Sequence, residues 1–137
     1  MSTFLVDSDV LIWTIRRHRG VEQALAQVVE TDADLLPALS AVTAFEALQG
    51  MRAGEEARHE EILGQLECLP VTGAIAELAA AMWRDQRTKG RTMNLGDALI
   101  AGTALCYDLV IVTYNRRHFE PLGIPVYDGL PAIESEG

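Results

Sequence analysis

Three acidic side chains stand among apolar or small residues instead of on polar faces: Asp7, Glu46 and Asp97. Asp7 follows a short apolar run of β-forming residues, so we expect it at the C-terminal tip of a buried strand, where open α/β sheets bind ligands. A buried carboxylate is costly unless a cation or hydrogen bonds compensate it. Carboxylates that converge in one pocket raise each other's pKa values unless a cation lies between them. The three acids therefore indicate a cation site.

Each of these acids also has a structural explanation as a helix cap, and this alternative stays open. Glu46 follows Thr43 by three residues, and Asp97 follows Asn94 by the same interval, which is the spacing of a capping box. An acid in the first turn of a helix also favours the helix dipole. The acid at the strand tip could likewise cap the first helix, and we assign Asp9 mainly to such a capping role.

The chemistry expected of an oxygen-rich site is that of a hard cation, either magnesium or manganese. Such an ion lowers the pKa of a bound water and withdraws charge from a phosphodiester in the transition state. Zinc is disfavoured because the three histidines lie far apart in the chain and show no ligand spacing: His18, His59 and His118.

The elements that must position these acids alternate between strands and helices. Strands are predicted at residues 4–6, 35–39, 68–71, 109–113 and 124–127. Helices are predicted at residues 10–17, 21–30, 40–50, 55–66, 74–87 and 95–107, the first of them apolar on nearly every side and therefore buried. The alternation predicts an α/β fold with a short, mostly parallel sheet. We expect one domain over residues 1–137, with a polar tail at 128–137.

The composition is typical of a globular domain and argues against a membrane or secreted protein. Hydrophobic residues make up 49% of the 137 residues, which is enough for a core, and the net charge is −9. The chain has neither an apolar run long enough to span a bilayer nor a signal-peptide pattern, so we expect no membrane contact and a cytoplasmic location. Cys68 and Cys106 are far apart and are expected to be reduced packing residues.

A uniformly acidic surface would repel nucleic acid, so the distribution of the basic residues along the chain matters more than the net charge.

The sequence resembles a known family, the PIN-domain ribonucleases, and within it the VapC toxins of VapBC toxin–antitoxin pairs. The resemblance covers nearly the whole chain and rests on four segments: residues 6–12, Glu46 with the following Gly50, residues 95–101 and residues 111–119. It implies a PIN-like three-layer sandwich, in which helices flank a short parallel sheet and the acids cluster at one edge.

The resemblance also implies roles for individual residues. Asp7 and Asp97 would be the main metal ligands, with Glu46 as the third acid, and the ion would be magnesium or manganese. A fourth family position, frequently aspartate, is Asn115 here, so a second metal would bind weakly or only with substrate. Thr113 would orient the ligands or the attacking water. Asp9 lies close enough in the chain to be a ligand.

Members of this family cut single-stranded or looped RNA, often tRNA or ribosomal RNA. The expected activity is therefore a magnesium-dependent endoribonuclease that acts as the toxin of such a pair. The expected partners are the RNA substrate and a VapB-type antitoxin whose C-terminal segment wraps the toxin near the acidic pocket. A homodimer is expected, with a heterotetramer or larger assembly once the antitoxin binds.

An acidic pocket cannot attract RNA by itself, so flanking arginines must make the phosphate contacts. Arg16, Arg17, Arg116 and Arg117 follow elements that begin or end near the expected site, and they are our candidates. Guanidinium groups suit bidentate phosphate contacts. Unpaired bases stack on aromatic rings, and Tyr114, beside a polar turn, is the expected stacking residue.

Two other functional classes remain open at this stage. The segment Asp7-Ser8-Asp9-Val10 also resembles the nucleophile motif of haloacid-dehalogenase-type phosphatases, with Asp7 as the nucleophile and Thr113 in the second motif. Against this, Lys89 is the only lysine and lies at no matching strand end, and no paired aspartates follow late in the chain. The second class is a non-catalytic binding module, in which the acids are caps and an apolar surface binds a partner.

Overall fold

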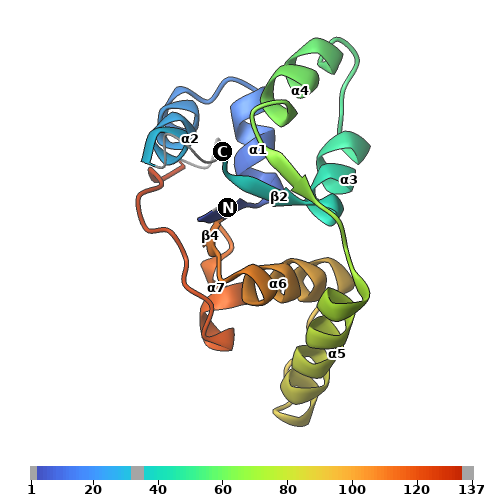
Figure 1. The fold of residues 1–137 in the computed structure, drawn as a ribbon. Helices are drawn as coiled ribbons and strands as arrows, with labels where there is room; N and C mark the ends of the chain where they lie inside the picture. Colours follow the sequence, from blue (N-terminus) through green and yellow to red (C-terminus); the bar gives the residue numbers. More distant parts are fainter. Residues whose placement is uncertain (1–2, 32–35, 134–137) are drawn as a thin grey trace.

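A computed structural model describes residues 3–31 and 36–133, and its centre is a four-stranded parallel sheet (Figure 1). The strands are β1 (Phe4–Val6), β2 (Ala38–Ser40), β3 (Glu67–Leu69) and β4 (Val110–Val112), in the order β3-β2-β1-β4. Each strand has three residues. Val126 adds one isolated parallel bridge to Ile111 beside β4. The C-terminal ends of all four strands therefore lie at one edge of the sheet.

Helices cover both faces of this sheet. They are α1 (Ser8–Ile15), α2 (Arg19–Thr31), α3 (Ala41–Gln49), α4 (Glu56–Leu63), α5 (Gly73–Thr88), α6 (Leu95–Tyr107), α7 (Arg116–Phe119) and the 3-10 turn Glu120–Leu122. Figure 1 shows α1, α2 and α4 on one side of the sheet and α6, α7 and α5 on the other. This arrangement confirms the predicted three-layer sandwich.

The alternation of side chains along β1 explains the two layers of the core. Phe4 and Val6 pack into one buried cluster with residues of α1, α2 and α4, whereas Leu5 packs into a second cluster with residues of α6. Successive side chains of a strand point to opposite faces, so a fully apolar strand must be covered on both. On the second face, α5 lies against α6 at Gly102, where a Cβ atom would come within 2.9 Å of the Ile75 carbonyl oxygen. That close approach holds α6 in place.

Several predicted boundaries were wrong. The first helix ends at Ile15, before Arg17 adopts a left-handed φ of 66°. The predicted strand at 124–127 is a single bridge residue, and the strand predicted at 35–39 is Ala38–Ser40, with residue 35 outside the described part. Trp13, expected in a buried helix, is 37% exposed, because this side of α1 is left uncovered.

The end of the chain also differs from the expected polar tail. Leu130 and Ile133 pack against the core beside β1, and the Tyr114 hydroxyl donates a hydrogen bond to the Pro131 carbonyl. Residues 134–137 of the predicted tail lie outside the described residues. Cys68 and Cys106 are free and exposed, contrary to their predicted packing role. Among the described helices, none is long and apolar enough to cross a bilayer.

Candidate metal centre and active site

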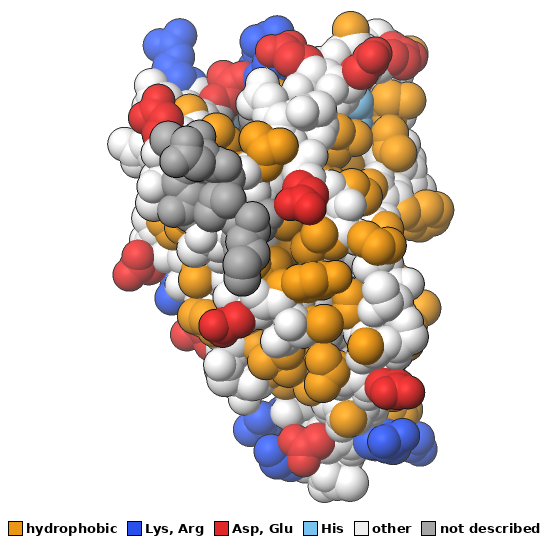
Figure 2. Space-filling view, viewed as in Figure 1, with side chains coloured by type: hydrophobic (Ala, Val, Ile, Leu, Met, Phe, Trp, Pro, Cys, Tyr) orange, Lys and Arg blue, Asp and Glu red, His pale blue; other side chains and the backbone are white. Residues whose placement is uncertain are grey.

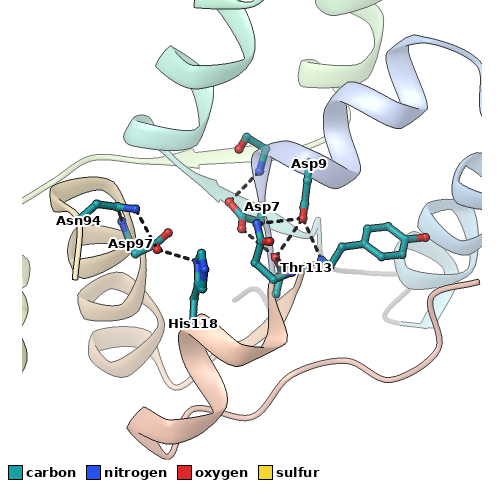
Figure 3. A network of polar contacts seen from close by, with 9 residues as sticks. Asp7, Asp9, Asn94, Asp97, Thr113 and His118 are labelled. Atoms are coloured by element: carbon teal, nitrogen blue, oxygen red, sulfur yellow. Dashed lines mark hydrogen bonds and ion pairs between the residues drawn. The ribbon is translucent and has the colours of Figure 1, made fainter. Parts of the chain in front are cut away.

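The C-terminal ends of β1 and β4 bring Asp7 and Thr113 together. Val6 and Val112 are paired in the parallel register, so the residues that follow them are neighbours although they are 106 positions apart. The Thr113 hydroxyl donates to Asp7 Oδ2 at 2.8 Å, and the Ser8 backbone amide donates to Asp7 Oδ1 at 2.8 Å (Figure 3). Asp7 is therefore the N-cap of α1 and is also held by the neighbouring strand.

Asp9 takes part in the same network, which adds contacts with the segment after β4 to its predicted role at the start of the helix. Its Oδ2 accepts a hydrogen bond from the Tyr114 amide at 3.0 Å and a longer one from Asn115 Nδ2 at 3.4 Å. Asp7 is the N-cap of α1, and Asp9 Oδ1 also accepts from the Val10 amide in the first turn of that helix at 2.8 Å. Asp9 thus joins α1 to the segment after β4 and adds a second carboxylate beside Asp7.

Glu46 approaches the site from α3, across from the first turn of α6. Its Oε2 lies 3.5 Å from the position that a Cβ atom on Gly96 would occupy, and its Oε1 is buried with no hydrogen-bond partner in the part of the chain that the structure describes. The capping box proposed for Thr43 and Glu46 is wrong, because Ser40 caps α3 through a hydrogen bond from the Val42 amide. Helix capping therefore does not explain Glu46.

Asp97 lies in the first turn of α6, and there the capping alternative is correct. Asn94 caps the helix: its Oδ1 accepts from the Asp97 amide at 2.7 Å, and its Nδ2 donates to Asp97 Oδ2 at 3.1 Å. Asp97 Oδ2 also lies 2.8 Å from His118 Nδ1, an ion-pair contact that lacks the alignment of a hydrogen bond. Figure 3 shows His118, from α7, between Asp97 and Asp7.

His118 is a site residue that the sequence analysis did not select. The three histidines were judged only by their spacing as zinc ligands, and the structure does place the other two elsewhere. His18 contacts the Trp13 ring, and His59 is buried in α4. A signal for His118 existed, since it follows Asn115 by about one helical turn in a segment that continues from a buried strand.

Burial raises the pKa values of three of these carboxyl groups, and neighbouring carboxylates add to the effect for Asp7 and Glu46. Burial, reinforced by the charge of Asp9, raises the pKa of Asp7 from 3.8 to about 7. Burial also raises the pKa of Asp9 and that of Glu46, and for Glu46 the nearby charges of Asp97 and Asp9 add to the effect. For Asp7, Asp9 and Glu46 the ionised state is therefore unfavourable without a cation.

The arrangement suits a cation that uses few protein ligands. Within residues 3–31 and 36–133, no three Asp, Glu, His or Cys side chains already stand together as a metal cage. The predicted convergence of Asp7, Glu46 and Asp97 is thus realised as interacting charges and not as a closed ligand set. Magnesium usually binds one or two carboxylates and keeps several waters. The unpartnered Oε1 of Glu46 and the raised pKa of Asp7 fit such an ion.

The predicted RNA-binding arginines lie in different surroundings. Arg16 and Arg17 follow the far end of α1, about 12 Å along the helix from Asp7, and they lie within 3.7 Å and 3.9 Å of glutamate oxygens of Glu55 and Glu22. Arg116 pairs with Glu120 and donates to the Tyr127 carbonyl. Arg117 makes no ion pair or hydrogen bond with any described residue, so its charge is the most available. The RNA role of all four stays a prediction, as does stacking on the half-buried Tyr114.

The fold and the site together define an α/β protein with a carboxylate-rich edge suited to a divalent cation. The family model for the PIN domain matches residues 4–123. The ribonuclease VapC10 of Mycobacterium tuberculosis is 39% identical over 115 residues, which are 84% of each chain. The ribonuclease VapC19 of the same organism is 30% identical, over 84% of this chain and 90% of that one.

The crystal structure of DNA-bound VapBC from Salmonella typhimurium contains a chain that is similar in fold. Its TM-score is 0.80 at 25% identity, and the match covers 94% of this chain and 99% of that one. This chain belongs to the PIN-domain family and, within it, groups with the VapC ribonucleases. The alternative of a haloacid-dehalogenase-type phosphatase loses its support, and the structure agrees, because Lys89 pairs with Asp85 at the exposed end of α5.

Proposed function

We propose that this protein is a metal-dependent endoribonuclease and the toxin of a toxin–antitoxin pair. The observation that carries the proposal is the buried Asp7 carboxylate at the end of β1, hydrogen-bonded to Thr113 and destabilised by Asp9. A buried carboxyl group with a strongly raised pKa is characteristic of functional sites. A metal-dependent hydrolase uses clustered carboxylates to bind a cation, which in turn coordinates the phosphate of the substrate. The names of the similar VapC ribonucleases support the same activity.

The residues of this chain have distinct proposed roles. Asp7 and Asp97, with Glu46, would hold magnesium, or manganese in its place. When bound, such an ion would neutralise the carboxylates and withdraw charge from the phosphodiester. Thr113 fixes the orientation of Asp7 through its 2.8 Å hydrogen bond. Asn115 adds no charge beside Asp9, so we expect one tightly bound ion, with a second only alongside substrate.

In the hydrolysis itself, a water molecule would attack the phosphorus atom while the bond to the leaving oxygen breaks. Glu46 is suited to accept the proton of that water, because among the described residues its buried Oε1 has no hydrogen-bond partner and because burial raises its pKa. Arg117 is the arginine best suited to hold the phosphate. We expect the substrate to be single-stranded or looped RNA, such as tRNA or ribosomal RNA, and the site of action to be the cytoplasm.

The proposed protein partners are a VapB-type antitoxin and a second copy of this chain. Figure 2 shows hydrophobic side chains gathered on the side of the molecule where α3, α6 and α5 lie. Leu95 is 74% exposed and Phe45 is 62% exposed. Two apolar grooves, each of about 510 Å³, share Leu95 and Leu99. An apolar surface of this kind is typical of an interface, and a homodimer that later binds antitoxin would cover it.

Cleavage of single-stranded RNA by the purified protein tests the activity. We expect cleavage with magnesium, none with a chelator, and loss of cleavage in Asp7→Asn and Asp97→Asn while the melting temperature is retained or raised. Asp128→Asn, which removes the same charge from an exposed residue, is the matched control and should cut normally. Full activity in both site variants would refute the assignment, and no cleavage by the wild type under any metal would favour the binding-module alternative.

A further inference from the structure

A cleft of about 430 Å³ lies beside the acidic site, between the end of α5, the loop before α6 and the segment of α7. The polar lining residues that matter here are Gln86, Arg91, Asn94, Asp97, Arg117 and His118. Asp97 and His118 also belong to the acidic site, so a molecule in the cleft would lie directly beside that site. The volume is in the range of small-ligand sites.

The cleft carries more positive than negative charge. Two guanidinium groups, those of Arg91 and Arg117, face one carboxylate, that of Asp97. Neither arginine makes an ion pair with any described residue, whereas Arg16, Arg17 and Arg116 all have glutamate partners. In a chain of net charge −9, two unneutralised arginines at one cleft indicate an anionic ligand. Arginine binds phosphate oxygens in bidentate geometry.

Gln86 gives the cleft a second kind of contact. It lies on α5 and is only 5% exposed, although the residues on either side of it are exposed. Its Oε1 accepts a long hydrogen bond of 3.5 Å from Arg91 Nη1, and across the described segments its Nε2 has no partner. The Asn94 amide is already bound to Asp97. The hydrogen-bonding groups that these lining residues leave available to a ligand, Gln86 Nε2 and the two guanidinium groups, are therefore donors.

The remaining lining is apolar and could support a flat ring. Met93, Pro121 and Leu122 line the same cleft. A nucleobase has apolar faces and a polar edge, and single-stranded RNA is bound by holding splayed bases against apolar or aromatic side chains while their edges are hydrogen-bonded. Guanine presents two adjacent acceptors, O6 and N7, whereas adenine presents an acceptor beside a donor.

We propose that this cleft holds one unpaired guanine nucleotide of the RNA, next to the phosphodiester that is cut. Arg91 and Arg117 contact its phosphate oxygens. Because Arg91 occupies Gln86 Oε1, Gln86 offers only its Nε2 donor, which fits guanine O6 and opposes the amino donor that adenine carries at the same position. The proposal deepens the proposed function and rests on it for the identity of the ligand as RNA. It adds a source of sequence preference that the acidic site lacks, since carboxylates and a cation recognise only the backbone.

Binding in the presence of a chelator tests the cleft separately from cleavage. The probes are fluorescein-labelled single-stranded octanucleotides, one with a central guanine and one with adenine in its place, followed by anisotropy across a range of salt. The variant Arg91→Ala/Arg117→Ala is compared with Arg19→Ala/Arg52→Ala, which removes the same charge from exposed arginines that do not line the cleft. Gln86→Met, close in size, tests the base contact.

We expect the cleft double variant to bind about tenfold more weakly or worse, and its salt slope to fall by about 1.4, which is roughly 0.7 for each lost phosphate contact. The control double variant should keep the wild-type slope. Gln86→Met should lose the preference for guanine and keep its affinity for the adenine probe.

Equal slopes in the two double variants, or an unchanged guanine preference in Gln86→Met, would overturn the proposal. Cleavage of the same RNA with magnesium is scored in parallel. If the cleft double variant binds and cleaves the RNA as well as the wild type does, the guanine subsite is refuted and the proposed ribonuclease activity stands. If binding follows the expected pattern but no protein cleaves the RNA, the subsite is supported and the proposed ribonuclease activity is refuted.

Discussion

Replacing Asp7 with asparagine should stabilise the metal-free protein at alkaline pH, although it should abolish cleavage. Asp7 is 4% exposed, and burial with the charge of Asp9 raises its pKa from 3.8 to about 7. The folded state therefore resists the loss of this proton, whereas the unfolded chain loses it readily. Folding is penalised whenever the group must be ionised, and asparagine removes that penalty.

The size and sign of the effect follow from linkage. The pKa rises by about 3 units, from 3.8 to about 7, and each unit corresponds to about 1.36 kcal/mol, so the full penalty is about 4 kcal/mol. It is absent below pH 3.8, grows up to about pH 7 and is complete above that. Asparagine has one side-chain oxygen and so loses one of the two hydrogen bonds from Ser8 and Thr113, at a cost of about 1 kcal/mol. The expected net gain above neutrality is about 2–3 kcal/mol.

Urea unfolding in the presence of a chelator, at pH 8 and near pH 4.5, measures this difference. The variant should be more stable than the wild type at pH 8 and within about 1 kcal/mol of it near pH 4.5. Asp128→Asn, at an exposed position, should change little at either pH. Magnesium should stabilise the wild type more than the Asp7 variant. Equal stabilities at pH 8, or a gain that is larger in acid than in base, would refute the reasoning.

Three further changes test separate parts of the site and surface. Thr113→Val removes the hydroxyl donor from Asp7, so the pKa of Asp7 should rise above its wild-type value. Carboxyl NMR titration of the metal-free protein would show this rise, and a lower pKa would contradict the proposed arrangement of the site. Asn115→Asp adds a carboxylate beside Asp9 and should tighten magnesium binding in calorimetry, whereas weaker binding would argue against its place there. Leu95→Arg places a charge in the exposed apolar face and should shift the sedimentation of the protein toward the monomer, and an unchanged species would exclude that face as the interface.

The local pattern of the chain was enough to predict the family, and it singled out acids whose role at a metal site stays a prediction. The apolar run before Asp7 required a buried strand, and its abrupt end required the acid to lie at the strand tip. The prediction of a parallel sheet between helical layers is confirmed, because alternating strands and helices allow few other arrangements. The PIN-domain assignment is confirmed by the family match over residues 4–123.

Other features depended on contacts between distant segments. Asp9 was predicted to cap the first helix from its neighbours in the chain, and its Oδ1 does accept from the Val10 amide. Its Oδ2 accepts from the Tyr114 amide, 105 positions away, which no local pattern could show. Arg116 and Arg117 are adjacent and chemically identical. Arg116 is bound to Glu120, whereas Arg117 has no ion pair within residues 3–31 and 36–133, a difference that only the direction of each side chain on α7 could decide.

By itself, the sequence determined which residues could be buried, where the strands had to end and which acids needed compensation. These are consequences of hydrophobic pattern and local backbone preference, which act over a few residues. The tertiary structure decided which acids interact, which arginines pair with glutamates and that Gln86 opens into a cleft beside Asp97. Side-chain charges and hydrogen bonds act over a few ångströms in space, and that proximity exists only once the register of β1 with β4 and the packing of α5 on α6 have been set.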